Sequence, residues 1–192
     1  MEDEKSKLII VEGPQGTGKT TLTNYLRDNM PGSNLYRLSG QKDKSINGRD
    51  YSVLMYSAGL MNYLSVMQNV PMDLIFDRTF ITEEVYARLG YKDYSFTETY
   101  KRLVDRLVEF DYDIYYFSLF LKQISLFEKR LQRDSHHNYQ AFSLENSLNQ
   151  QNTYMEISNE LKEYDKINVY DIAMDNFDDS YEKIGKVLKL KR

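Results

Sequence analysis

The segment VEGPQGTGKTTL, residues 11–22, has the residue types and spacing of a phosphate-binding loop, the Walker A motif. Gly13, Gly18, Lys19 and Thr20 match the pattern G-x-x-x-x-G-K-[ST]. Such glycines let successive backbone N–H groups curl around a phosphate chain, and the following helix N-terminus adds a partial positive charge. In this pattern the lysine reaches the outer phosphates and the threonine hydroxyl ligates Mg²⁺. The segment therefore predicts binding of a nucleoside triphosphate with magnesium, without naming the acceptor of a phosphoryl group.

The phosphate-binding candidates are the small and polar residues of this loop and of the first helical turn after it. They are Gly13, Gln15, Gly16, Thr17, Gly18, Lys19, Thr20 and Thr21.

A second polar segment, DRTFITEEVYA at residues 77–87, directly follows the apolar run MDLIFD. In parallel α/β sheets, ligands collect at the carboxyl ends of the strands. Asp77 and Arg78 are therefore expected to face the same crevice as the phosphate-binding loop. With Thr20, Asp77 is the candidate for organising Mg²⁺.

A third segment, FEKRLQRDSHHNY at residues 127–139, is basic. On a helix, Ile124, Phe127 and Leu131 would share one side, while Lys129, Arg130 and Arg133 would gather on another. The first side predicts packing against the protein. The second predicts either a cluster that contacts phosphate or a solvated surface.

The elements that must position these segments alternate along the chain. Short apolar runs, typical of strands, occur at 8–11, 35–38, 72–77, 113–121 and 167–172. Helical spacing occurs at 22–30, 50–68, 100–107, 122–134 and 144–164, and in a last helix that ends at Leu188. Strands joined by helical crossovers predict a three-layer α/β sandwich with a five-stranded parallel sheet. Residues 1–192 are expected to form a single domain.

Composition excludes several classes of function. The net charge of −4 argues against binding a nucleic-acid polymer, which needs clustered positive charge. Cysteine is absent, so a disulfide framework, a thiolate metal site and a cysteine nucleophile are all excluded. The N-terminus MEDEKSK is charged, and no apolar run approaches the length of about 18 residues that a membrane span needs. We therefore expect a cytoplasmic protein with no membrane partner and a small-molecule substrate; a homodimer is left open.

Two other classes with phosphate-binding loops fit the sequence poorly. LSGQ at residues 38–41 matches a signature of ABC ATPases, but it follows the loop too closely in a chain too short for that fold. The guanine-reading motif Asn-Lys-x-Asp of GTPases has no counterpart after the late strands. A small-molecule kinase is the remaining class.

The segment at 77–87 resembles the thymidylate kinase and deoxynucleoside kinase group. Both branches have an acidic residue and an arginine at this point, matched by Asp77 and Arg78, and a Ser or Thr four positions later, matched by Thr82. The aromatic residue Tyr86 lies at a spacing more similar to thymidylate kinases. The resemblance implies ATP as phosphoryl donor, Mg²⁺ held in part through Asp77, and acceptor contact by Arg78.

The same resemblance places a lid at about 122–142, with Arg130 and Arg133 closing over the transferred phosphate. After the second strand, thymidylate kinases have an arginine and usually a nearby glutamate, and deoxynucleoside kinases have a glutamate that serves as base. This chain has YRLSGQKD, with Arg37 at the arginine position and no glutamate. The pattern favours a nucleoside monophosphate as acceptor, with Lys19, Arg37, Arg78, Arg130 and Arg133 as the catalytic candidates.

Two alternatives stay open from the sequence. The first is a deoxynucleoside kinase that phosphorylates a 5′-hydroxyl, in which Glu12 could serve as the base. The second is a non-catalytic ATP-binding regulatory protein, and the missing glutamate is the reason to consider it.

Overall fold

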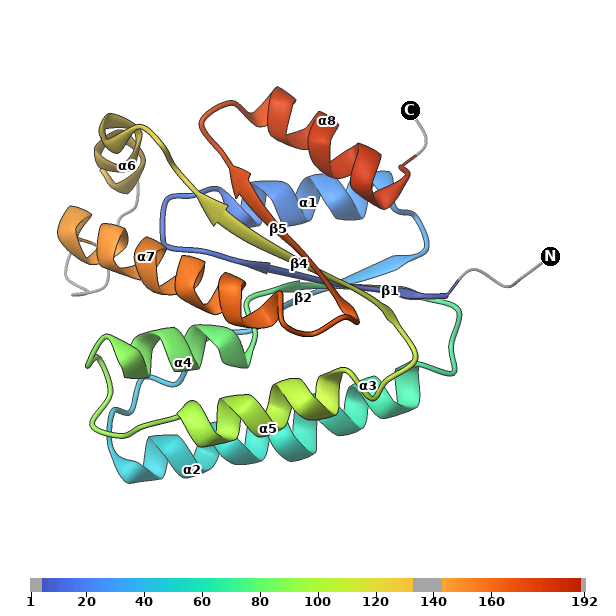
Figure 1. The fold of residues 1–192 in the computed structure, drawn as a ribbon, viewed down its shortest axis with the longest axis horizontal. Helices are drawn as coiled ribbons and strands as arrows, with labels where there is room; N and C mark the ends of the chain where they lie inside the picture. Colours follow the sequence, from blue (N-terminus) through green and yellow to red (C-terminus); the bar gives the residue numbers. More distant parts are fainter. Residues whose placement is uncertain (1–4, 133–142, 191–192) are drawn as a thin grey trace.

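A computed structural model describes residues 5–132 and 143–190. Its centre is one parallel sheet of five strands in the order β2-β3-β1-β4-β5 (Figure 1). The strands are β1 (Lys7–Glu12), β2 (Ser33–Arg37), β3 (Asp73–Asp77), β4 (Asp113–Phe120) and β5 (Ile167–Ala173). All four pairings between neighbouring strands are parallel.

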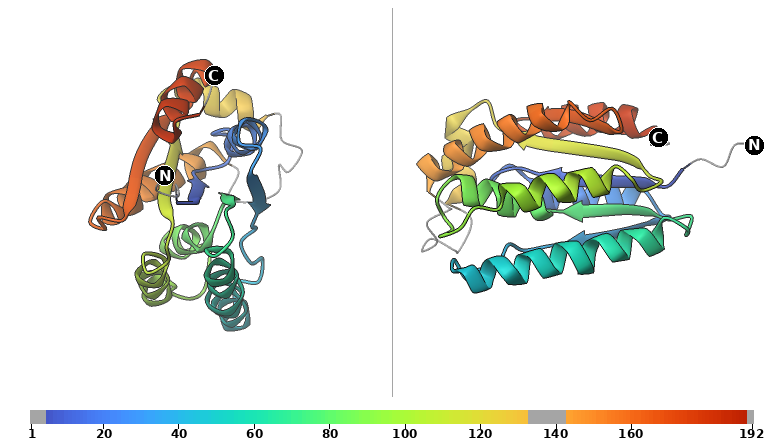
Figure 2. Two further views of the ribbon diagram at one scale, coloured as in Figure 1. Left: turned by 90° about the vertical axis from the view of Figure 1, so that its right-hand side faces the viewer. Right: turned by 60° about the horizontal axis from the view of Figure 1, so that its bottom comes forward.

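Helices cover both faces of this sheet, which makes three layers (Figure 2). The helices α1 (Lys19–Asn29) and α8 (Phe177–Leu188) lie on one face. On the opposite face lie α2 (Ile46–Leu54), the π-helical turn η1 (Met55–Leu60), α3 (Met61–Met67), α4 (Phe80–Arg88), α5 (Thr97–Leu107) and α7 (Leu144–Leu161). The short helix α6 (Ile124–Leu131) lies beside the loop between β1 and α1, because Arg130 and Leu131 pack against Gly16.

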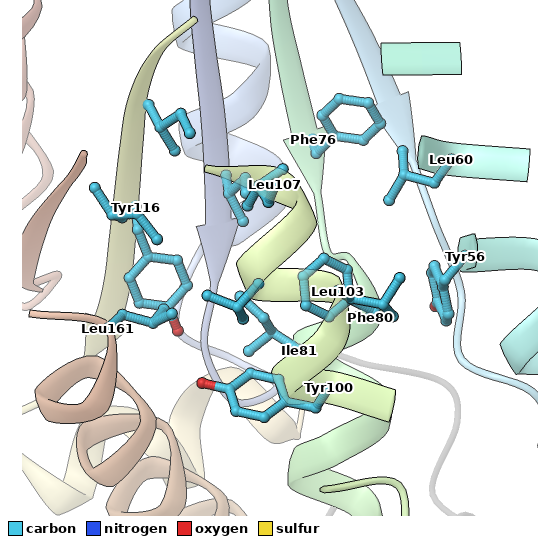
Figure 3. Close-up of a cluster of buried hydrophobic side chains, with 14 of the residues drawn as sticks. Tyr56, Leu60, Phe76, Phe80, Ile81, Tyr100, Leu103, Leu107, Tyr116 and Leu161 are labelled. Atoms are coloured by element: carbon cyan, nitrogen blue, oxygen red, sulfur yellow. The ribbon is translucent and has the colours of Figure 1, made fainter. Parts of the chain in front are cut away.

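Two cores lie between these layers, one on each face of the sheet. Strand β1 supplies both: Leu8 and Ile10 join the larger core, and Ile9 joins the core under α1 and α8. A strand covered on both faces is expected to be apolar along its middle, as residues 8–11 of β1 are. Figure 3 shows the larger core, where Tyr116 of β4 lies among side chains from the helices of that face.

The register of the sheet aligns the strand ends that carry polar residues. Asp77 at the end of β3 pairs with Val11 of β1 on one side and with Arg37 of β2 on the other. Since β1 runs directly into the phosphate-binding loop, both Arg37 and Asp77 are placed next to it.

The predicted fold class is confirmed, and so are all five predicted strands. The second helical segment begins earlier than expected, at Ile46, because the Ser45 hydroxyl accepts a hydrogen bond from the backbone N–H of Asn47 and caps it. The prediction for α6 is wrong at Ile124, which is 54% exposed, whereas Phe127 and Leu131 are buried as expected. Within the described ranges, no helix has the length and hydropathy needed to cross a membrane.

Candidate active site

The loop between β1 and α1 has the backbone of a phosphate cradle. Gly13, Gly16 and Gly18 all have positive φ, of 145°, 82° and 96°. A Cβ atom on Gly13 would lie 2.6 Å from the carbonyl oxygen of Leu119, and one on Gly18 would lie 2.8 Å from the ring of Phe177. Larger residues at these two positions would therefore force the loop away from its neighbours.

The N-terminus of α1 is available to an anion. Gly18 occupies the N-cap position and provides no side-chain hydrogen bond to the first turn. The uncapped N–H groups and the helix dipole together favour a phosphate at this point. The Lys19 ammonium lies over the loop, where it donates a hydrogen bond of 2.7 Å to the carbonyl oxygen of Pro14.

Asp77 links the loop to two strand ends. Its Oδ2 atom accepts a hydrogen bond of 3.0 Å from the Thr20 hydroxyl and lies 3.6 Å from Nε of Arg37. Arg37 also donates a hydrogen bond to the side chain of Asn24 in α1. Only 5% of Asp77 is exposed, so this carboxylate is held in a fixed position at the edge of the sheet.

The oxygens of Thr20 and Asp77 suit Mg²⁺, which binds through one or two protein oxygens together with substrate phosphates and water. In the part of the chain that the structure describes, no group of three or more His, Cys, Asp or Glu side chains could hold a metal ion. The residues present therefore fit a magnesium ion that arrives with a nucleotide better than a metal caged by the protein.

Arg78 adopts a conformation that is rare outside glycine, with φ of 74°. Its backbone N–H donates to the carbonyl oxygen of Val11, which fixes this turn against β1. The guanidinium donates to Oε1 of Gln15 at 3.2 Å and to the Thr82 hydroxyl at 3.4 Å. Arg78 is thereby aimed from the end of β3 toward the phosphate-binding loop.

Glu12 holds the turn that carries Arg78. It is fully buried and accepts hydrogen bonds from the N–H of Thr79 at 2.6 Å, from the Thr79 hydroxyl at 2.9 Å and from the Thr82 hydroxyl at 2.6 Å. Burial raises the pKa of the Glu12 carboxyl, and these hydrogen bonds partly oppose the shift. With both carboxylate oxygens engaged inside the protein, Glu12 is a positioning group and a poor candidate for the base.

The cationic residues of the basic helix α6 lie in different environments. Arg130 lies over the phosphate-binding loop, donating to the carbonyl oxygens of Gly16 at 3.3 Å and Thr17 at 3.4 Å, and its guanidinium stands 4.8 Å from the ring centre of Phe177. Lys129 is exposed. Arg133 and much of the expected lid fall outside the described residues.

These groups meet in one cavity of about 440 Å³. Its described lining consists of Gln15, Gly16, Gly18, Lys19, Thr20, Thr21, Arg37, Leu38, Asp77, Arg78, Arg130 and Phe177. Ten of the candidates from the sequence are therefore brought together. Gly13 and Thr17 lie behind the cavity: Gly13 packs on Leu119, and the buried Thr17 hydroxyl donates to Pro14.

No protein-family model matches the chain, and no curated protein matches it in sequence. Among solved structures, it is similar to the YorR protein of Bacillus subtilis, in complex with phosphorylated GDP, with a TM-score of 0.63 at 19% identity, covering 95% of each chain. Thymidylate kinase from Candida albicans has a TM-score of 0.61 at 15% identity, covering 96% of this chain and 93% of that one. Deoxyadenosine kinase from M. mycoides has a TM-score of 0.59 at 17% identity, covering 95% and 98%.

The chain has the fold of the P-loop nucleotide kinases. The resemblance inferred from residues 77–87 is confirmed at the level of the fold, and the P-loop kinase architecture extends over almost the whole chain.

Sequence reasoning missed two residues that line this cavity. Phe177 follows the last strand by four residues and contacts both Gly18 and Arg130. Leu38 directly follows β2. The rule that ligands collect at strand carboxyl ends could have identified both, had it been applied to apolar residues as well as to charged ones.

Proposed function

We propose that this chain is an ATP-dependent kinase that transfers a phosphoryl group to a nucleoside or deoxynucleoside monophosphate. The observation that carries the proposal is the arrangement of Arg37 and Arg78 at adjacent strand ends, beside Asp77 and the phosphate-binding loop. Residues 1–192 would act as a single domain, with a lid at about 122–142.

The donor side of the cavity supplies groups for the triphosphate. The backbone of the glycine loop and the N-terminus of α1 would bind the phosphate chain, and Lys19 would leave the carbonyl of Pro14 for the outer phosphates. Magnesium, when bound near Thr20 and Asp77, would neutralise charge on the phosphates. Arg130 would stabilise the charge that spreads over the phosphoryl group during transfer.

The acceptor side favours an anion over a hydroxyl. The second pKa of a phosphate monoester is about 6, so a monophosphate is mostly dianionic near neutral pH and needs cations to hold it. A 5′-hydroxyl instead gains from a general base. Asp77 is the sole carboxylate among the described lining residues, and its Oδ2 already faces Thr20 and Arg37.

In the proposed reaction, an oxygen of the acceptor phosphate attacks the γ-phosphorus of ATP, and the bond between that phosphorus and the β–γ bridging oxygen breaks. The products are ADP and a nucleoside diphosphate. The dianionic acceptor carries no proton on the attacking oxygen, so the step requires no base.

The test is ADP release measured with ATP, MgCl₂ and a panel of nucleosides and their 5′-monophosphates. The matched control is the Lys19→Ala protein, which removes the phosphate contact and reports contaminating kinases. Turnover with a monophosphate that is lost in Lys19→Ala supports the proposal. Faster turnover with nucleosides would favour a deoxynucleoside kinase, and ATP binding without turnover on any acceptor would favour a regulatory ATP-binding protein.

A further inference from the structure

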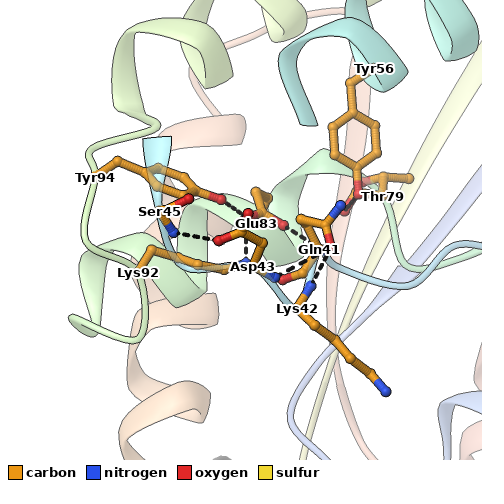
Figure 4. A network of polar contacts seen from close by, with 9 residues as sticks. All are labelled: Gln41, Lys42, Asp43, Ser45, Tyr56, Thr79, Glu83, Lys92 and Tyr94. Carbon is orange, nitrogen blue, oxygen red and sulfur yellow. Dashed lines mark hydrogen bonds and ion pairs between the residues drawn. The ribbon is translucent and has the colours of Figure 1, made fainter. Parts of the chain in front are cut away.

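A buried ion pair holds the loop of residues 38–45 that leaves the acceptor side of the sheet (Figure 4). Nζ of Lys92 lies 2.9 Å from Oε1 of Glu83, and their side chains are 2% and 0% exposed. Tyr94 donates its hydroxyl to the same glutamate. These residues come from α4 and from the segment between α4 and α5, whereas the loop joins β2 to α2.

Both members of the ion pair form hydrogen bonds with the backbone of one loop residue, Gln41. Lys92 donates to the carbonyl oxygen of Gln41, and Oε2 of Glu83 accepts the N–H of Gln41 at 3.2 Å. A Cβ atom on Gly40 would stand 3.3 Å from that same Oε2, so the glutamate fits closely against a glycine. The N–H of Asp93 also donates to the carbonyl oxygen of Lys44 at 2.9 Å, which extends the attachment along the loop.

The attachment joins the two segments that carry the acceptor arginines. Gln41 lies four residues after Arg37, and Glu83 directly follows Thr82, which hydrogen-bonds to Arg78. A buried charge pair with all its hydrogen bonds in place fixes geometry strongly, because loss of one partner leaves the other charge buried and unpaired. The relative position of Arg37 and Arg78 should therefore depend on this pair.

We propose that the ion pair of Lys92 and Glu83 is a positioning device for the acceptor site, which sets affinity for the acceptor by holding the 38–45 loop. The inference rests on the proposed kinase function. Neither residue of the pair is among the described lining of the cavity, so neither is expected to touch ATP or the acceptor.

The kinetic test uses Lys92→Met, Glu83→Gln and the double variant. Each single variant leaves one polar or charged partner buried without its mate, so the KM for the monophosphate should rise at least about tenfold while the KM for ATP changes less than about twofold. The double variant removes both charges. Its KM for the monophosphate should therefore be closer to the wild-type value than the KM of either single variant is. Additive effects of the two changes, or an equal rise in the KM for ATP, would overturn the proposal.

The matched control is Arg88→Met. Arg88 also forms ion pairs from α4, to Glu84 at 2.7 Å and to Glu160 at 2.6 Å, but these contacts do not reach the loop. This variant should lower thermal stability without changing the KM for the acceptor. An equal change in both the Arg88 and the Lys92 variants would mean that general destabilisation, and not the loop, explains the kinetics.

A second measurement does not depend on kinase activity. Lys42 and Lys44 are exposed in the loop, so trypsin can report its opening. Mass spectrometry should show faster cleavage after these lysines in Lys92→Met than in Arg88→Met and wild type under native conditions. Unchanged cleavage would overturn the proposal even if the enzyme is active, whereas faster cleavage in a chain without turnover would contradict the proposed function alone.

Discussion

The Thr20 hydroxyl donates a hydrogen bond of 3.0 Å to Oδ2 of Asp77, which lies 57 residues further along the chain. The same oxygen faces Arg37 at 3.6 Å, so a single carboxylate connects α1, β2 and β3. This arrangement places hydroxyl, carboxylate and guanidinium groups around one point at the sheet edge. Binding of a cation between Thr20 and Asp77 would replace their direct hydrogen bond and free the carboxylate from Thr20.

Asp77→Asn should therefore weaken the apparent affinity for magnesium. The amide oxygen is a poorer ligand because it lacks the carboxylate charge, while its size preserves packing. We expect the MgCl₂ concentration at half-maximal activity to rise severalfold at saturating ATP, measured by titration of wild type and variant. Asp175→Asn, at a carboxylate that accepts backbone hydrogen bonds from Lys122 and Gln123, is the control. An unchanged magnesium requirement in Asp77→Asn would remove Asp77 from the metal site.

Arg130→Ala should lower kcat by at least about tenfold and raise the KM for ATP by less. An arginine that stabilises charge developing during transfer contributes more in the transition state than in the bound substrate. Lys129→Ala is the matched control, because Lys129 is the cation next to Arg130 in the chain and its side chain is exposed. Steady-state kinetics at varied ATP separate the two parameters. A rise in KM alone would make Arg130 a contact for the bound nucleotide, consistent with its position beside Phe177.

Glu12→Gln should change how stability depends on pH. Burial raises the pKa of Glu12 above its ordinary value of 4.5, so the native state retains a proton that the unfolded state releases. The contribution of Glu12 to the free energy of unfolding is therefore fully present at pH values below its pKa in the unfolded state. It is lost as the pH rises through its pKa in the native state. The free energy of unfolding of wild type should fall relative to Glu12→Gln over this interval, by about 1.4 kcal/mol for each unit of pKa shift.

Urea denaturation between about pH 4 and pH 8 tests this difference, because glutamine does not titrate in that range. Glu109→Gln, at an exposed glutamate, is measured in parallel as the surface control. The quantity compared is the free energy of unfolding of wild type minus that of Glu12→Gln, and it should decrease as pH rises. A value that stays constant, or that increases with pH, would contradict the expected direction.

Much of the site could be predicted because it follows from chain direction and topology. The glycine pattern predicts that Lys19 and Thr20 lie at the cavity, because their positions depend on local backbone geometry. Asp77, Arg78 and Arg37 could be predicted because the polar residues that end parallel strands must meet at one edge of the sheet. The structure adds the register, which pairs Asp77 with Arg37 directly.

Other features depend on contacts that a one-dimensional pattern does not encode. Helical spacing places Lys129 and Arg130 side by side, but the way α6 packs on the loop leaves Lys129 in solvent and brings Arg130 to Gly16. The pairing of Glu83 with Lys92 depends on side-chain conformations and on the path of the 38–45 loop. Hydrophobic periodicity contains no information about either.

The final prediction concerns Arg78 and the choice of acceptor. In wild type, kcat/KM for a nucleoside monophosphate should be more than about tenfold higher than kcat/KM for the corresponding nucleoside. The reason is that a charge-assisted hydrogen bond to phosphate contributes about 1.5–3 kcal/mol. Arg78→Ala should remove most of this preference. The low activity on the nucleoside should stay nearly unchanged, because the nucleoside has no phosphate group for Arg78 to contact. Alanine retains the strain of a non-glycine residue at φ of 74°, so the turn itself should not relax in the variant.

Arg102→Ala, at an exposed arginine of α5, is the control and should preserve the preference. The measurement is kcat/KM for paired substrates that share one base, in wild type and both variants. A nucleoside phosphorylated faster than its monophosphate by wild type would reverse the assignment of the acceptor. Equal loss on both substrates in Arg78→Ala would instead show that Arg78 acts on the transferred phosphoryl group, because that group is common to both reactions.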